Sequence, residues 1–303
     1  MKRIYSLLFL IVLAVQLYAI KDTRERSLTG FDKLDVQDCF EVHYTENNIF
    51  RVYIDTLDGE LLAKTNTVVT DGTLCISYNG NRIERIPVYI SAPMLSKVSV
   101  SEVSSFIAES DMNLPYAELS VSGIGSLTLR SLTTTLAIVN KKGTGSFVMD
   151  GALVCDTLIG EVEGAGSMKL NSITSIITNI SVSGTCSCDI KGIVSTQKFI
   201  SSMNGAGNIN ITGDIQAKEN VWLEMYGAGS VNVYGHIYAR RLNVRLRGLG
   251  KINTQEIQVG TIDAVVKGLG TIYLAGSALQ MTEETSRFGT INTDNLKIIN
   301  LQK

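Results

Sequence analysis

Two glutamates come nearest, by residue type and spacing, to a catalytic pair. Glu161 and Glu163 lie two positions apart in an alternating segment, so an extended chain would place both on one face with backbones about 6.7 Å apart. Inverting glycosidases hold their two carboxyl groups about 6.5–9.5 Å apart. Lys142, about twenty residues earlier, offers an ion pair that explains Glu163 equally well. We therefore expect no catalytic residue and no enzyme activity.

Metal and cofactor chemistry also find little support. The two histidines, His43 and His236, have no partners at metal-ligand spacing and no nucleophile nearby in the sequence. Glycine pairs such as Gly123-Ile-Gly125 do not form a dinucleotide-binding loop, because the third glycine is missing and a strand rather than a helix follows. The sequence predicts no metal and no cofactor.

A basic surface is the better candidate for binding. Its members, which we call the basic ridge, are Trp222, Tyr226, Arg245, Arg247 and Lys267. Tyr226, Arg247 and Lys267 follow one another at intervals of about one repeat, so stacked turns would align them and allow a cation–π contact at Tyr226. Such a ridge could bind an anionic glycan. The alternative is a solvent-exposed face without a ligand, in which Glu224 pairs with Arg245. We favour this alternative, because surface charge pairs are common and seldom specific.

The scaffold for these side chains is a repeat that runs from Glu102 to Ile291. Eight units begin with a glycine that is followed by alternating apolar residues, and in seven of them a second glycine stands two positions after the first. Successive first glycines are 20, 21, 20, 21, 22, 21 and 20 residues apart. These first glycines are Gly123, Gly143, Gly164, Gly184, Gly205, Gly227, Gly248 and Gly268. A fixed short period is the mark of a repeat architecture.

The pattern within each unit indicates strands with one buried face. Apolar residues stand two and four positions before the first glycine and four and six after it, as in Leu119, Val121, Leu127 and Leu129. A unit of this length is too short for a strand, a crossover helix and a second strand. It suits one turn of a β-solenoid whose strands pair in register with the next turn. About ten turns at about 4.8 Å each would give a rod about 43 Å long.

The same phase places both glycines on the inward side, where a Cβ would collide with neighbouring backbone. Two residues break the pattern. Cys186 replaces a second glycine, so we expect a local bulge there, and Lys141 occupies an inward position that only a register shift would explain. On the outward side, Asn210, Asn232, Asn253 and Asn292 form a column interrupted by Tyr273, which predicts amide hydrogen bonds along the axis.

The chain divides into three parts. Residues 1–19 have a positive start, an apolar run and a cleavage point at Tyr18-Ala19, which indicates a signal peptide, and the run is short for a membrane span. Residues 20–97 carry strand patterns separated by turn signals at Asp58-Gly59, Asp71-Gly72 and Asn79-Gly80, and we interpret them as a β section that caps the solenoid. Residues 98–303 form the solenoid repeat region.

Composition limits the classes of partner. Charged residues make up 18% of the 303 residues and the net charge is −2, so nothing general attracts nucleic acid. The cysteine count is five, and an oxidising compartment would permit disulfides. Cys39 with Cys75 is one candidate pair, and Cys186 with Cys188 lies at the edge of disulfide geometry. For Cys155, Cys186 and Cys188 the role of a small buried hydrophobe is the stronger interpretation.

The serial units from Gly123 to Leu274, with the opening Phe31-Asp-Lys-Leu-Asp-Val36, resemble the head-GIN domain family, whose members are described as autotransporter adhesins. The resemblance covers nearly the whole mature chain. It implies a right-handed parallel β-helix exposed beyond the inner membrane of bacteria and an adhesive role, and it carries no catalytic residues. One departure is that no translocating barrel follows the repeats.

We expect an all-β, single-stranded, right-handed β-solenoid with an N-terminal β cap, exported to the periplasm or the outer surface. The leading function is a non-catalytic adhesin or structural binding module of the cell envelope, with a glycan or an envelope component as its partner. The alternative is a polysaccharide-active enzyme or a glycan-binding module on the same scaffold. The ligand, the oligomeric state and the side of the outer membrane stay open.

Overall fold

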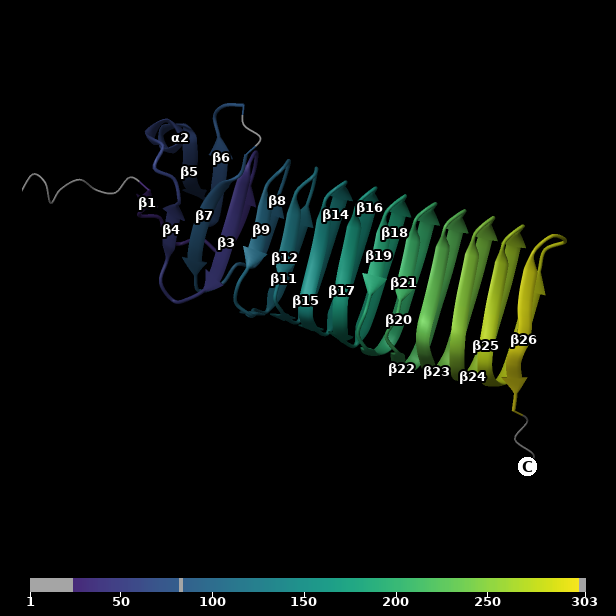
Figure 1. The fold of residues 1–303 in the computed structure, drawn as a ribbon. Coiled ribbons are helices and arrows are strands. Elements are labelled where there is room, and N and C mark those ends of the chain that lie inside the picture. Colours follow the sequence, from purple (N-terminus) through teal and green to yellow (C-terminus); the bar gives the residue numbers. More distant parts are fainter. Residues whose placement is uncertain (1–23, 82–83, 300–303) are drawn as a thin grey trace, which may run out of the picture.

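The computed structural model describes residues 24–81 and 84–299. The expected signal peptide, residues 1–19, lies outside this range, as does Lys303. Figure 1 shows an elongated body in which the N-terminal strands occupy one end and successive layers of strands lead to β26 at the other.

The described chain is almost entirely strand, with one short helix. The elements before the repeat are β1 (Glu25–Arg26), β2 (Lys33–Val36), β3 (Phe40–Glu46), β4 (Arg51–Ile54), α2 (Gly59–Lys64), β5 (Thr65–Thr70), β6 (Thr73–Tyr78) and β7 (Ile86–Ala92). The first half of the repeat contains β8 (Lys97–Val100), β9 (Ser105–Ala108), β10 (Met112–Asn113), β11 (Tyr116–Val121), β12 (Ser126–Leu129), β13 (Leu132–Thr133), β14 (Leu136–Gly143), β15 (Ser146–Val154), β16 (Thr157–Gly164) and β17 (Ser167–Thr174). The second half contains β18 (Ile177–Gly184), β19 (Ser187–Ile190), β20 (Val194–Gly205), β21 (Asn208–Ile211), β22 (Ile215–Gly227), β23 (Ser230–Gly248), β24 (Lys251–Gly268), β25 (Thr271–Thr285) and β26 (Thr290–Ile298).

The predicted solenoid is confirmed. Each strand of the repeat pairs in parallel with its copy in the next turn, so that Ser146 lies beside Ser167 and Ser167 beside Ser187. About ten turns follow one another at intervals of about 21 residues. Equivalent residues of successive turns therefore lie side by side. The number of residues between a side chain and the glycine pair determines with which side chains of the neighbouring turns it is aligned.

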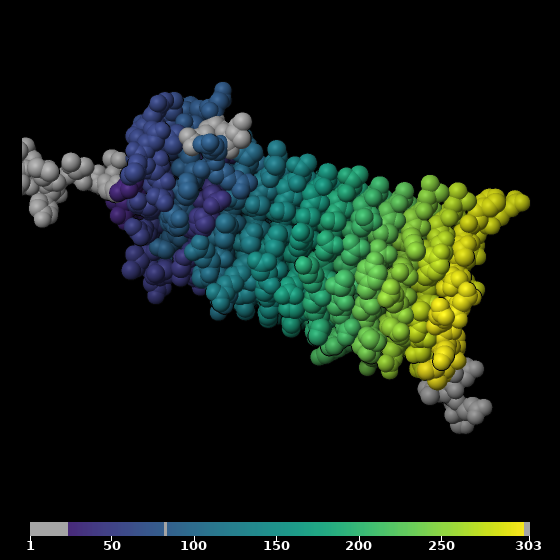
Figure 2. Space-filling model, in the orientation of Figure 1, coloured from purple at the N-terminus to yellow at the C-terminus, as the bar shows by residue number. Residues whose placement is uncertain are grey.

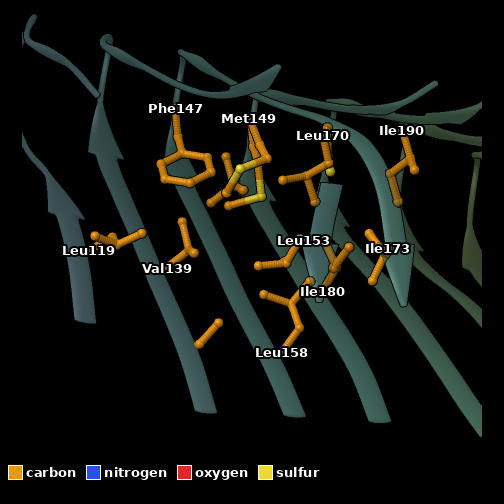
Figure 3. Packing of buried hydrophobic residues seen from close by; sticks show 14 of the residues in the cluster. Leu119, Val139, Phe147, Met149, Leu153, Leu158, Leu170, Ile173, Ile180 and Ile190 are labelled. Carbon is orange, nitrogen blue, oxygen red and sulfur yellow. The ribbon is translucent and has the colours of Figure 1, made fainter. Parts of the chain in front are cut away.

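The core fills the interior of the coil. The inward residues Leu119, Val121, Leu127 and Leu129 are at most 1% exposed, as their alternation predicted. Figure 3 shows side chains from consecutive strands pointing into this interior, with Phe147 close to Met149 in the same view. Burying one such aliphatic or aromatic side chain contributes about 1.5–3 kcal/mol, so a continuous apolar column stabilises the stack turn by turn.

The two glycines of each pair have different roles, which corrects the expectation that both point inward. The first lies at a corner with a left-handed backbone, as at Gly143 (φ +86°) and Gly227 (φ +124°), and is not buried. The second is buried at most corners. A Cβ on either glycine would collide with a carbonyl oxygen of the preceding turn, as at Gly143 over Gly123 and at Gly145 over Gly125. Glu102, which replaces the first glycine in the first copy, also has φ +58°. The corner therefore requires a left-handed backbone at its first residue and leaves no room for a Cβ at either glycine.

Neither anomaly in the pattern shifts the register. Gly164 pairs with Gly184 and Ser167 with Ser187 on either side of Cys186, so the bulge expected there is wrong. Lys141 pairs in register with inward-facing positions of the preceding and the following turn, so the expected register shift is also wrong. Cys186 and Lys141 are both buried inside an undistorted coil.

The N-terminal strands combine parallel and antiparallel pairing. Strands β2 and β3 pair in parallel with β8 and β9 of the first repeat turn, whereas β4 runs antiparallel to β7 and β5 antiparallel to β6. Asp71-Gly72 forms the predicted hairpin turn, with both residues at positive φ. The other two turn predictions are wrong: Asp58 is the N-cap of α2, and Asn79-Gly80 follows β6, whose strand partners are β2 and β5.

Candidate functional site

The structure brings the members of the basic ridge together on one outer face. They lie in the C-terminal halves of β22, β23 and β24, which stack in register. Tyr226 lies beside Arg247, and Arg247 lies beside Lys267 on the following turn. Because these positions alternate with buried ones, all of these side chains point away from the core.

Two cation–π contacts organise this face. The guanidinium carbon of Arg245 lies 5.1 Å from the centroid of the Trp222 ring, and that of Arg247 lies 5.7 Å from the Tyr226 ring. The expected contact at Tyr226 is therefore present, and a second one at Trp222 accompanies it. Aromatic support restricts the motion of a long arginine side chain while its donors stay available to solvent.

The acidic residues nearby neutralise only part of the positive charge of the basic ridge. Glu224 lies beside Arg245 in register, but its carboxylate accepts a hydrogen bond of 3.4 Å from the Tyr226 hydroxyl, and Arg245 lies over Trp222 instead. Lys267 lies 3.6 Å from a carboxylate oxygen of Glu284. The two arginines consequently carry most of the positive charge of the basic ridge.

The two glutamates near the middle of the rod have different neighbours. Lys142 Nζ lies 3.6 Å from Glu163 Oε2, which is the ion pair that the sequence suggested. Glu161 has Asn140 on the preceding turn and Ser181 on the next as its register neighbours. An exposed ion pair of this kind has a small energetic effect, and the neighbouring turns bring no further carboxylate beside Glu161.

Each histidine has acidic neighbours. His43 lies between Glu109, at 2.7 Å, and Glu41, at 3.1 Å. His236 lies 3.3 Å from Asp214. Among residues 24–81 and 84–299, no group of three or more potential ligands is arranged to hold a metal ion.

The amide column is confirmed in part and begins earlier than expected. Asn210 Nδ2 donates to Asp189 Oδ1 at 2.9 Å, and Asn232 Nδ2 donates to Asn210 Oδ1 at 3.1 Å. Asn292 donates instead to Asp294 of its own strand, at 2.8 Å. The ladder thus spans three consecutive turns and stops short of the C-terminal ones.

The cysteines are present as thiols rather than as the candidate disulfides. Cys75, Cys186 and Cys188 are all free, so neither the Cys39–Cys75 bond nor the Cys186–Cys188 bond is formed. Burial raises the pKa of Cys155 to about 12, as expected for the small buried hydrophobe that the sequence suggested.

The sequence did not predict two hollows on the surface. One is a groove of about 680 Å³ near the C-terminal end. Its walls include His236, Tyr238, Glu256, Gln258, Ser277 and Lys297. The rings of His236 and Tyr238 are nearly parallel, at 10°, with centroids 5.7 Å apart. The groove lies where Gly276 lacks a side chain and the strand register shifts, a feature that a repeat count alone does not show.

The other hollow, of about 570 Å³, lies where β2 and β8 meet the first repeat turns. Two of its charged groups pair with each other: Lys97 Nζ lies 2.8 Å from Glu118, and the Tyr116 hydroxyl donates to the same carboxylate at 3.0 Å. The hydrogen bond from Lys97 is the main cause that lowers the pKa of Glu118. The remaining charged lining residues, Lys33 and Asp35, have opposite signs, so the hollow does not present the single positive sign of the two ridge arginines.

Comparison with known proteins identifies relatives of the fold. The sequence profile of the family described as "Putative auto-transporter adhesin, head GIN domain" matches residues 30–214, 158–278 and 193–302. No curated protein matches the chain. Within the described residues, none of the helical structure is long and apolar enough to cross a membrane.

Two solved structures share the fold at low sequence identity. One, titled a putative adhesin from Parabacteroides distasonis, is 15% identical, with a TM-score of 0.51 over 88% of this chain and 94% of that one. The other, titled a putative adhesin from Parabacteroides merdae, is also 15% identical, with a TM-score of 0.50 over 85% of this chain and 94% of that one. At this identity the likeness supports the fold alone.

Proposed function

Because the chain belongs to the head GIN domain family of adhesin-like proteins, we propose that it is an exported, non-catalytic adhesin whose basic ridge binds an anionic glycan. The family description supports adhesion at or beyond the cell surface. The apolar run at residues 4–17, which follows Lys2 and Arg3, supports export. Envelope localisation, whether periplasmic or on the outer surface, is part of this proposal.

The observation that carries the ligand class is the position of Arg245 over Trp222, 5.1 Å from the ring centroid. A guanidinium held over an aromatic ring presents a planar set of donors that matches a carboxylate or a sulfate. Arg247 repeats the arrangement over Tyr226 one column away. A chain of acidic sugars would therefore meet two oriented guanidinium groups on one outer face.

Binding of an acidic oligosaccharide tests this proposal directly. Isothermal titration with a galacturonic acid oligomer, and with its neutral galactose counterpart, should show binding of the acidic oligomer only. Arg245→Ala and Arg247→Glu should each weaken that binding roughly tenfold without changing the circular dichroism spectrum. Lys198→Ala is a matched control, because Lys198 also faces outward on this side and pairs with Glu219 at 3.5 Å. Unchanged affinity in both arginine variants would remove the basic ridge from consideration.

The enzymatic alternative has its own test. The protein is incubated with acidic polysaccharides, and the release of reducing ends is measured. We expect no turnover, because Glu161 has only Asn140 and Ser181 beside it in register. Turnover that Glu161→Gln abolishes would establish an enzyme in place of an adhesin.

We also propose that the section up to residue 97 caps the solenoid. Parallel pairing of β2 with β8 and of β3 with β9 supports this role, because it covers an edge that would otherwise be open to other strands. A chain shortened to residues 98–303 should aggregate at concentrations where the longer protein stays monodisperse in light scattering. Equal solubility of the two chains would argue against a cap.

A further inference from the structure

A row of large apolar side chains stands exposed at one corner of the solenoid. It consists of the residues at the middle position of the corner in the last three turns, which we call the apolar corner: Leu249, Leu269 and Phe288, with exposed fractions of 64%, 58% and 66%. Leu249 and Leu269 each stand between two glycines, and Phe288 stands between Arg287 and Gly289. In the five preceding turns the same position holds only threonine or alanine, in the order Thr144, Ala165, Thr185, Ala206 and Ala228. The fold therefore has no need of large apolar residues at this position.

The three side chains are neighbours along the rod axis. Gly248 pairs with Gly268 immediately before the two leucines, so Leu249 and Leu269 are about 4.8 Å apart in backbone position. Pairing of Thr271 with Thr290 places the segment of Phe288 on the following turn. Figures 1 and 2 show that this segment, between β25 and β26, projects beyond the body at the C-terminal end of the corner edge.

Basic residues border the apolar corner on both sides. Arg247 and Lys267 each come just before the glycine pair of their turn. Lys251 comes just after a glycine pair, and Arg287 is adjacent to Phe288. Lys251 Nζ lies 4.7 Å from the Tyr273 ring centroid, and Arg287 lies 5.4 Å from the Phe288 ring. The acidic residue Glu284 also lies at this border, where it forms an ion pair with Lys267.

We propose that the apolar corner docks on the surface of a lipid bilayer that contains anionic lipids. Exposed leucine and phenylalanine side chains next to lysine and arginine are what an interfacial membrane contact requires: the apolar groups enter the acyl boundary and the cations remain at the headgroup phosphates. The charge border favours an anionic bilayer over a second copy of this chain, since two copies meeting at this corner would bring like charges together. The border shares Arg247 and Lys267 with the basic ridge, but the inference rests on the three apolar residues and does not depend on the proposed glycan binding.

Vesicle co-sedimentation tests the inference with the purified protein. Vesicles of phosphatidylcholine alone are compared with vesicles in which phosphatidylglycerol replaces a third of the lipid, at low and at high salt. We expect binding to the anionic vesicles, weaker binding in high salt because the charges are screened, and little binding to the neutral vesicles.

The decisive variant replaces Leu249, Leu269 and Phe288 together by threonine, the residue that this position already carries at Thr144 and Thr185. Its partition onto anionic vesicles should fall roughly tenfold or more, because the insertable apolar surface is lost. Ile124→Thr is the matched control: Ile124 occupies the same position at the other end of the rod, is 66% exposed, and should leave partition unchanged.

Three results would overturn the inference. The first is absence of wild-type binding to anionic vesicles. The second is equal partition of the wild type and the triple variant. The third is a self-associating wild type and a monomeric triple variant in sedimentation velocity, without a difference on vesicles, which would assign the corner to contact between copies. A double variant, Lys251→Glu with Arg287→Glu, should also lower partition, and only on the anionic vesicles.

Discussion

Lys141 extends from one turn of the solenoid into the space that Gly166 leaves open in the next. A Cβ on Gly166 would collide with the ammonium nitrogen of Lys141. That nitrogen donates to the carbonyl oxygen of Gly143 at 2.6 Å and approaches that of Glu163 at 3.4 Å. The lysine is 0% exposed, so the glycine and the lysine together fill a volume that other turns fill with an aliphatic side chain.

The first prediction concerns this buried charge. Burial lowers the pKa of Lys141, and the neighbouring Cys186 opposes the shift in part. Lys141→Met should raise the free energy of unfolding by about 1 kcal/mol at pH 7, because it removes a buried charge and keeps the volume. The Gly143 carbonyl keeps its bonds from the amides of Ala165 and Gly166 at 3.0 and 3.2 Å.

The gain should shrink as the pH rises. The unfolded chain binds the Lys141 proton more tightly than the folded chain, so wild-type stability increases with pH from the lowered pKa toward the ordinary value of 10.5. Urea unfolding of both proteins at pH 7 and pH 9 measures the difference. A methionine variant that is less stable at pH 7 would contradict the prediction.

The second prediction separates a corner glycine from an ordinary one. Gly227 has φ +124°, and a Cβ there would collide with the Gly205 carbonyl. Gly160 is buried, but a Cβ there would meet no atom nearer than 3.5 Å. Gly227→Ala should therefore lower the free energy of unfolding by about 3 kcal/mol or more, and Gly160→Ala by less than about 1 kcal/mol. Thermal unfolding with equal losses for the two variants would refute the role of the corner.

The third prediction concerns the amide ladder. Asn210 both donates to Asp189 and accepts from Asn232, so Asn210→Ala should cost about 1–2 kcal/mol of unfolding free energy. Asn253 stands in the same column beside Asn232, and the described residues offer it no side-chain hydrogen bond. Asn253→Ala serves as the control in denaturant titrations and should cost less than about 0.5 kcal/mol.

The fourth prediction is a loss of stability at alkaline pH. Burial raises the pKa of the Cys155 thiol from its ordinary value of 9.0 to about 12. The folded state then keeps a proton that the unfolded state releases, so the stabilisation is complete below about pH 9 and falls as the pH rises toward 12. Cys155→Val should make the fall shallower by about 1 kcal/mol per pH unit, measured by urea unfolding between pH 8.5 and 10.5. An identical slope would show that another group is responsible.

The repeat made the strand register predictable, but not the contacts of individual polar side chains. The 21-residue interval between Ser146 and Ser167 is enough to place one above the other. The same repeat interval placed Glu224 beside Arg245, and the two residues are register neighbours. The Arg245 side chain nevertheless contacts the diagonal neighbour Trp222, because a flexible arginine has several partners within reach. Helix α2 was missed because its six residues show no helical period, although Asp58 is a suitable N-cap.

The sequence by itself determined the coil, its period and its inward face, because a repeated pattern of glycine and alternating apolar residues has one way of stacking. Only the tertiary structure decided how Lys141 is buried without a register shift, where the groove at Gly276 opens, and that Leu249, Leu269 and Phe288 form one exposed row. These outcomes depend on the space that neighbouring turns leave to a side chain. That space is set by residues about 20 positions away along the chain and a single strand spacing away in the coil.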